Sequence, residues 1–210
     1  MELETAYGPG RVEIEVAESP WLVLALTHGS AGGVDAPDLL AVRDAALAAG
    51  VSVARVVQPF RLRGARAPGP VAKQDEAWLA LIGALRARLP GLPLVQGGRS
   101  NGARVACRTA REAGAEGVVA LAFPLHPPGR PERSRADELR GAGVRVLVVN
   151  GDRDPFGVPA EADADRLVVL AGEGHDLKRE PARVGAEVAR WLAERVRPRC
   201  SPGRSAGGGR

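Results

Sequence analysis

Four short segments of this chain carry residue types that support nucleophilic chemistry, and each follows an apolar run. The first is Gly98-Arg99-Ser100-Asn101-Gly102, a G-x-S-x-G pattern between the apolar residues 92–96 and a helical pattern. A serine on such a sharp turn between strand and helix adopts a strained backbone and is presented as a nucleophile. The helix N-terminus also favours the negative charge that develops during attack. Ser100 is therefore the predicted nucleophile, and the alternative is a Gly/Ser helix start without chemistry.

Two further segments supply the base and the acid that a serine nucleophile needs. The predicted base is His175, on a glycine-flanked loop after the last predicted strand, from which it can reach a nucleophile two strands away. The predicted acid is Asp154, in the segment Asn150-Gly151-Asp152-Arg153-Asp154. Asp154 is favoured over Asp152 because it lies further past the strand end. The alternatives are a solvated histidine and an Asp-Arg surface turn.

The fourth segment is a glycine-rich turn, His28-Gly29-Ser30-Ala31-Gly32-Gly33, which exposes backbone N–H groups. We predict that the N–H groups of Ser30 and Asn101 form an oxyanion hole, which stabilises the negative charge of a tetrahedral intermediate. His28 is predicted to position this loop and not to act as the general base. The alternative is that the glycines only make a tight turn after a strand.

Strands and helices that must position these loops alternate along the whole chain. Short apolar runs predict strands, and amphipathic patterns predict helices. The predicted strands are residues 12–16, 21–26, 51–57, 92–96, 118–123, 144–149 and 166–170, and the predicted helices are residues 38–49, 73–89, 100–113, 134–141 and 181–196. This alternation predicts a three-layer α/β fold in one domain, residues 1–196, with a mainly parallel sheet covered on both faces. The carboxyl ends of parallel strands meet at one edge, so we expect the four loops to converge there.

Charge and hydropathy exclude several classes of partner. The formal net charge is +4, and the excess lies in the Gly/Pro/Ser-rich tail, residues 197–210, which has arginines and no acid. The rest of the chain is formally neutral, so we expect no nucleic-acid partner. We predict that the tail is disordered. No apolar stretch approaches the ~20 residues of a membrane span, so no membrane partner is expected.

Cofactor motifs are missing from the sequence. It has no Cys/His cluster, no His-Glu-x-x-His pattern and no G-x-x-x-x-G-K-[ST] loop, so we predict neither a metal nor another cofactor. Cys107 and Cys200 are not expected to form a disulfide, because one lies in a predicted helix and the other in the tail. Residues 1–5 lack the basic start and apolar run of a signal peptide. We expect a cytoplasmic protein, and the sequence leaves its oligomeric state open.

Together these segments resemble those of a known family. The chain is similar to the compact α/β hydrolases related to dienelactone hydrolase. It is more closely similar to the hydrolase-like domain shared by small bacterial proteins, a testis-expressed animal protein and a subunit of the NSL chromatin complex. The similarity is carried by residues 27–33 with Asp38, and by residues 97–103, 124–129, 151–157 and 174–175. It implies an α/β-hydrolase fold with Ser100 as nucleophile, Asp154 as acid and His175 as base, in the family's usual chain order.

The segment after residues 118–123 indicates how open the site is. Many α/β hydrolases insert a cap domain at this point, and residues 123–133 are too few to form one. We therefore expect an uncapped site. His126, in the turn His126-Pro127-Pro128-Gly129, is a candidate for lining the pocket, and a rigid proline turn is the alternative.

The predicted function is that of a serine hydrolase. It would cleave an ester, thioester or related carbonyl bond of a small molecule through an acyl-enzyme intermediate. One alternative is a catalytically weak scaffold with a hydrolase fold that acts in protein interaction. Another is an acyltransferase that uses the same three residues. The substrate and the leaving group do not follow from the sequence.

Overall fold

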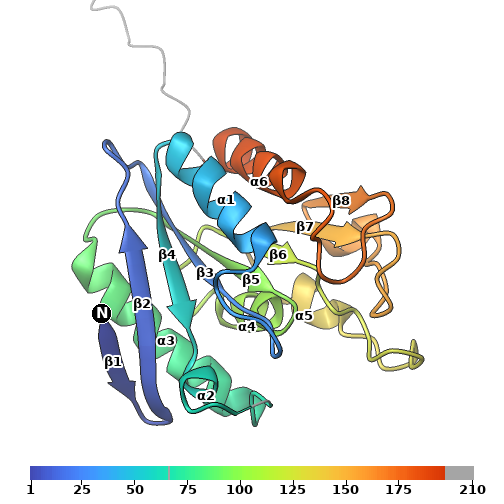
Figure 1. Cartoon of the computed structure of the whole chain (residues 1–210), viewed down its shortest axis with the longest axis horizontal. Coiled ribbons are helices and arrows are strands. Elements are labelled where there is room, and N and C mark those ends of the chain that lie inside the picture. Colours follow the sequence, from blue (N-terminus) through green and yellow to red (C-terminus); the bar gives the residue numbers. More distant parts are fainter. Residues whose placement is uncertain (66, 197–210) are drawn as a thin grey trace, which may run out of the picture.

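The computed structural model describes residues 1–65 and 67–196, so the predicted tail lies outside the described residues. Its centre is an eight-stranded sheet with the order β1-β2-β4-β3-β5-β6-β7-β8 (Figure 1). The strands are β1 (Glu2–Thr5), β2 (Gly8–Glu15), β3 (Leu22–Thr27), β4 (Val51–Val57), β5 (Leu94–Arg99), β6 (Gly117–Leu121), β7 (Arg145–Gly151) and β8 (Arg166–Leu170). The strands from β3 to β8 run parallel to one another, which confirms the predicted fold class.

The central strands have continuous apolar sequences because helices cover both faces of the sheet. Every residue of β3 and of β6 is buried. Strands that are buried on both faces of a parallel sheet lack the alternation of polar and apolar residues that marks a half-exposed strand. The sequence prediction therefore located these strands, although β5 extends to Arg99 and β7 to Gly151, beyond their predicted ends at residues 96 and 149.

One edge of the sheet is formed by an antiparallel hairpin, β1 and β2, of which only β2 was predicted. Strand β1 pairs with β2, and β2 pairs with β4, both antiparallel. The turn is held by Thr5, whose Oγ1 accepts the Tyr7 N–H at 3.1 Å and donates to the Gly8 carbonyl oxygen at 2.7 Å. Strand β1 has the sequence Glu-Leu-Glu-Thr, with only one apolar side chain, so it gave no hydrophobic run to detect.

Helices cover both faces of the sheet and form two separate cores. The helices are α1 (Pro37–Ala48), α2 (Pro59–Leu62), α3 (Val71–Arg88), α4 (Asn101–Thr109), α5 (Ala136–Arg140) and α6 (Pro181–Arg195). Side chains of α1 and α6 pack on one face, where Trp191 is fully buried, and those of α3, α4 and α5 pack on the other, where Trp78 is fully buried (Figure 1). Pro37 and Pro181 begin α1 and α6, where the missing N–H removes no helical hydrogen bond.

Three further features describe the chain. Within the described residues, no helix combines the length and apolar character needed to cross a bilayer. The segment between β6 and α5 is a loop and adds no further domain among the described residues, which confirms the absence of a cap. Cys107 is a buried free thiol in α4, and burial raises its pKa.

Candidate active site

The turn between β5 and α4 forces Ser100 into an unusual backbone conformation. Its φ is 53° and its ψ is −114°, a region that residues other than glycine rarely occupy. The turn is this tight because α4 starts directly above β3. A Cβ at Gly98 would lie 2.6 Å from the Thr27 carbonyl oxygen, and one at Gly102 would lie 2.8 Å from that of His28. The two glycines of the G-x-S-x-G pattern are therefore required by the close approach of helix and strand.

The structure brings Ser100, His175 and Asp154 together in a line of hydrogen bonds. His175 Nε2 lies 2.8 Å from Ser100 Oγ, and His175 Nδ1 lies 2.8 Å from Asp154 Oδ2. A carboxylate can only accept, so the neutral imidazole carries its proton on Nδ1. Nε2 is then free to accept the proton of the Ser100 hydroxyl. This tautomer is the one that a general base for Ser100 requires.

Asp154 and Asp152 have different partners. The side chain of Asp154 is fully buried, and its Oδ1 accepts the Phe156 N–H at 2.8 Å. The exposed Asp152 instead uses Oδ1 to accept the Gly172 N–H at 2.7 Å, which ties the loop after β7 to the loop that carries His175. The structure thus places Asp154, and not Asp152, against the imidazole.

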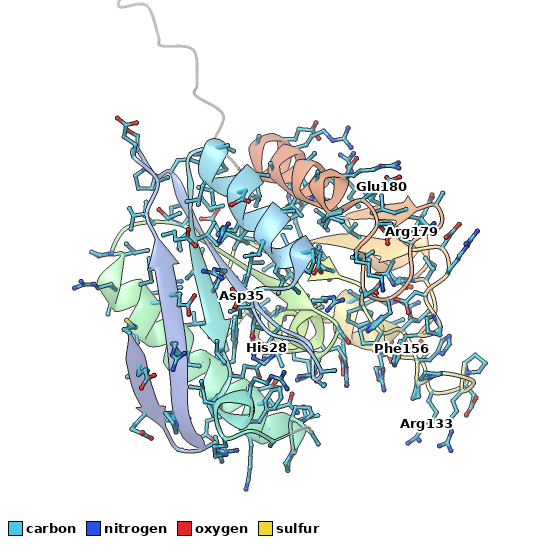
Figure 2. All side chains as sticks on the ribbon, in the orientation of Figure 1. His28, Asp35, Arg133, Phe156, Arg179 and Glu180 are labelled. Atoms are coloured by element: carbon cyan, nitrogen blue, oxygen red, sulfur yellow. The ribbon has the colours of Figure 1, made fainter. Side chains whose placement is uncertain are left out.

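Two neighbours of Asp154 were not predicted from the sequence. The buried Asn150 amide accepts the Phe123 N–H at 2.8 Å and has its Nδ2 3.4 Å from Asp154 Oδ2. The ring of Phe156, labelled in Figure 2, lies against the His175 ring with the centroids 4.2 Å apart. Asn150 is the second-last residue of β7 and Phe156 follows a proline, and neither position carries a sequence signal for a role in the site.

A pocket of about 300 Å³ opens onto Ser100. Both predicted oxyanion residues line it, Ser30 from the loop after β3 and Asn101 from the first turn of α4. Among the described residues, neither of their backbone N–H groups has a hydrogen-bond acceptor. A Cβ at Gly29 would lie 3.2 Å from the Ser100 Cβ, so the glycine lets the loop approach Ser100 closely. These two unpaired amides, one in the loop after β3 and one at the N-terminus of α4, suit a developing oxyanion.

The other two histidines lie away from the pocket. His28 is fully buried, accepts the Gln58 N–H on Nε2 at 3.1 Å and donates from Nδ1 to the Gly29 carbonyl oxygen at 2.8 Å (Figure 2). Burial lowers its pKa, so it is a neutral residue that holds the loop after β3. His126 is not among the residues that line this pocket. Its ring packs against Gly157, where a Cβ would lie 2.4 Å from Nε2.

Arg99, the second residue of the G-x-S-x-G pattern, connects several parts of the site. Its Nε lies 3.2 Å from Oδ2 of the fully buried Asp38, and its Nη2 donates to the Asp176 carbonyl oxygen at 2.8 Å. One side chain thus joins the nucleophile turn, the start of α1 and the loop of His175. Burial raises the Asp38 pKa to about 6, while the Arg99 charge opposes this shift. No role for Arg99 was predicted from the sequence.

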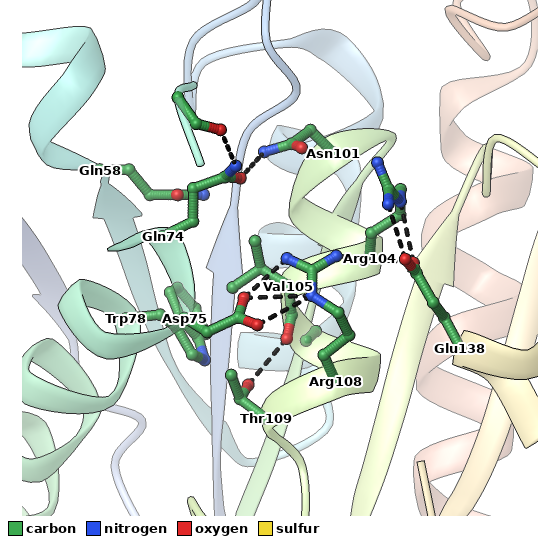
Figure 3. Close-up of polar contacts among 12 residues, drawn as sticks. Gln58, Gln74, Asp75, Trp78, Asn101, Arg104, Val105, Arg108, Thr109 and Glu138 are labelled. Carbon is green, nitrogen blue, oxygen red and sulfur yellow. Dashed lines mark hydrogen bonds and ion pairs between the residues drawn. The ribbon is translucent and has the colours of Figure 1, made fainter. Parts of the chain in front are cut away.

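Asn101 is held by a polar side chain of α3. Its Nδ2 donates to Gln74 Oε1 at 2.8 Å, and Gln74 Nε2 donates to the Gly69 carbonyl oxygen at 2.8 Å (Figure 3). Both side chains are buried, so this pair fixes the residue whose N–H faces the pocket. In residues 1–65 and 67–196, no group of three His, Cys, Asp or Glu side chains is arranged to hold a metal ion.

The mainly parallel sheet, with a serine on a strained turn at the end of a strand, places the chain among the α/β proteins. A family model described as an alpha/beta hydrolase domain matches residues 20–197, and the chain belongs to this family. The resemblance stated from the sequence motifs is thereby confirmed. Comparison with curated protein sequences gives no match.

Solved structures with this fold include three at low sequence identity. An alpha-beta serine hydrolase homologue from Coxiella burnetii is 16% identical with a TM-score of 0.76, covering 91% of this chain and 96% of that one. XC6422 from Xanthomonas campestris, an a/b serine hydrolase without lid, is 19% identical with a TM-score of 0.74, over 94% and 95%. Dienelactone hydrolase from Anabaena variabilis is 16% identical with a TM-score of 0.70, over 92% and 95%. At these identities the likeness establishes the fold alone.

Proposed function

We propose that the protein is a serine hydrolase that cleaves an ester, thioester or related carbonyl bond of a small molecule. The observation that carries the proposal is the pair of 2.8 Å contacts that links Ser100 Oγ to His175 and His175 to Asp154 beside a pocket. The fold alone would not support it, because the same fold serves many functions. A cytoplasmic location is part of this proposal.

In the first half of the reaction, Ser100 Oγ attacks the carbonyl carbon while His175 Nε2 takes the hydroxyl proton. The negative charge of the tetrahedral intermediate falls on the former carbonyl oxygen, which the N–H groups of Ser30 and Asn101 bind. Asp154 stabilises the imidazolium and keeps its ring oriented. The intermediate then collapses, the bond to the leaving group breaks, and His175 gives its proton to that group.

In the second half, water releases the acyl group from Ser100. His175 Nε2 removes a proton from the water as its oxygen attacks the acyl carbon, and the same two N–H groups bind the new oxyanion. The bond to Ser100 Oγ breaks, and His175 returns the proton to the serine. The loop between β6 and α5 leaves the pocket without a cap domain, so water has access to the acyl-enzyme.

The proposal is tested with a fluorophosphonate probe, which reacts with activated serines. We expect the folded protein to be labelled on the peptide that contains Ser100, and Ser100→Ala to remain unlabelled. Ser134→Ala is the matched control, because its Oγ only accepts the Ala136 N–H, so labelling should persist.

A panel of short-chain esters, thioesters and lactones then measures turnover. Ser100→Ala should lower kcat by several orders of magnitude, as expected for loss of a nucleophile. Folded protein that reacts with none of several probe types and hydrolyses none of the panel would contradict the proposal. That result would favour the scaffold alternative.

A further inference from the structure

The pocket in front of Ser100 is lined by three arginines. Arg99, Arg104 and Arg135 contribute to its wall together with His175. In the described part of the chain, no aspartate or glutamate is among the lining residues. A small, partly desolvated site with cationic walls attracts negative charge more strongly than an open surface does. The question is whether these charges are already neutralised within the protein.

Two of the three arginines have carboxylate partners. Arg99 pairs with the buried Asp38 at 3.2 Å. Arg104 makes a two-point contact with Glu138, from Nε at 2.8 Å and from Nη2 at 2.6 Å (Figure 3). Both pairs have a fixed geometry, because the carboxylates sit on helices that pack against the sheet.

Arg135 lacks such a partner. Its Nη1 donates to the Pro124 carbonyl oxygen at 2.9 Å, and no carboxylate of the described residues lies within 4.0 Å of its guanidinium. Partial burial lowers its pKa, and the nearby Arg104 lowers it further, against the opposing effect of Glu138. The protein thus holds a half-buried cation beside a second cation, which is unfavourable without a counter-charge.

The surrounding ion pairs do not supply this counter-charge. Glu138 is bound to Arg104 and also lies 3.5 Å from Arg108 Nη1, while Asp75 is bound to Arg108 at 2.6 Å (Figure 3). This cluster has two carboxylates for the three guanidinium groups of Arg104, Arg108 and Arg135. One positive charge is left over, and it lies at the end of the cluster that faces the pocket.

We propose that Arg135, supported by Arg104, forms a subsite for an anionic oxygen group of the substrate, so that the preferred esters carry a carboxylate or a phosphate. The inference rests on the proposed hydrolysis at Ser100 and names its substrate class. The planar guanidinium matches such groups with two parallel hydrogen bonds. A pocket of about 300 Å³ that holds both the subsite and the nucleophile suits a short substrate.

The main test compares two esters that differ in charge and in one methyl group. They are the 4-nitrophenyl monoester of adipic acid and the methyl ester of that compound. We expect the wild-type kcat/KM for the anionic ester to exceed that for the neutral ester by about tenfold or more. In Arg135→Gln, kcat/KM for the anionic ester should fall about 10- to 100-fold, which is the usual effect of losing a charge-assisted hydrogen bond. The value for the neutral ester should stay within about twofold.

The control for overall charge is Arg130→Gln. Arg130 lies on the exposed part of the same loop and is not among the residues that line the pocket. Its replacement removes the same charge and should leave the preference for the anionic ester within about twofold of the wild-type value. An equal loss in both variants, or a wild type without preference for the anionic ester, would overturn the inference.

Two further experiments distinguish a carboxylate ligand from a phosphate ligand, and distinguish failure of the anion subsite from failure of the proposed hydrolysis. The 4-nitrophenyl ester of 4-phosphonobutyric acid replaces the carboxylate with a phosphonate, so the better substrate of the two indicates the natural group. Titration calorimetry with adipate measures binding without turnover. Adipate binding that is lost in Arg135→Gln supports the subsite even if no ester is hydrolysed, whereas absence of binding to the wild type contradicts it. Hydrolysis of neutral esters without a preference for anionic ones would support the proposed function and contradict the anion subsite.

Discussion

Replacing Asp38 with asparagine tests how the buried ion pair beside the nucleophile affects stability. Asp38 lies in the first turn of α1 with no exposed side-chain surface, and Arg99 Nε is 3.2 Å from its Oδ2. Burial is the largest influence on its pKa, which rises from 3.8 to about 6. The nearby Asp176 acts in the same direction and Arg99 acts against it. The loss of water therefore outweighs the attraction of the guanidinium.

The sign of the pH effect follows from this shift. The folded protein binds the Asp38 proton more tightly than the unfolded chain does, so the protonated form favours folding. This contribution is complete below the unfolded pKa of 3.8 and is lost as the pH rises through the folded value of about 6. A shift of about 2 pKa units corresponds to about 3 kcal/mol in total, and roughly half of it falls between pH 5 and pH 7.5.

Asp38→Asn removes this titration, so the comparison needs only two pH values. The free energy of unfolding would be measured in urea for both proteins at about pH 5 and about pH 7.5. We expect the stability of the wild type relative to the variant to fall by about 1 to 2 kcal/mol at the higher pH. Asp44→Asn, on the exposed side of the same helix, should show a much smaller change. A difference that is independent of pH, or one that grows with pH, would refute the reasoning.

Two further pairs of variants separate positions that look alike in the sequence. Asp154→Asn should lower kcat by about 10⁴-fold because His175 then adopts the wrong tautomer, while Asp152→Asn should stay within a few-fold in steady-state assays with esters. Equal losses would contradict the assignment of Asp154. Gly98→Ala should cost several kcal/mol in urea unfolding and remove probe labelling, because its Cβ would lie 2.6 Å from the Thr27 carbonyl oxygen. Gly83 lies in helix α3, and a Cβ added there would have no neighbouring atom within 4 Å. Gly83→Ala should therefore stabilise the folded protein by about 0.5 to 1 kcal/mol.

The parts of the site that could be predicted share one property. Ser100, Asp154 and His175 each follow an apolar strand, and a parallel sheet brings its strand ends to one edge. The local sequence was therefore enough to predict that these three residues lie at the same edge of the sheet, although they are far apart along the chain. Of the hairpin formed by β1 and β2, only β2 was predicted. The residues of β1 are mostly polar, and they form a strand because they pair with β2 and not because they are buried.

The residues that line the pocket without lying in a motif could not be predicted. Arg135 follows a proline-rich loop, and its place in the wall depends on how that loop returns to the Pro124 carbonyl oxygen. His126, from the same loop, was predicted in the pocket and instead packs on Gly157. Nothing in the local sequence distinguishes these two residues, because loop direction is set by contacts with distant segments.

The class of fold, and the chain order of the residues proposed as nucleophile, acid and base, could be predicted from the sequence. Both depend on hydrophobic periodicity and on short turns, which are encoded within a few neighbouring residues. The contacts of the folded chain were needed to establish that Asp154 and not Asp152 lies against His175. They also establish that Arg99 joins the turn at Ser100 to Asp38 and to the loop of His175. The tertiary structure also left Arg135 without a carboxylate partner among the described residues. Hydrogen bonding and charge balance depend on distances of a few ångströms between segments far apart in the chain, and packing alone sets those distances.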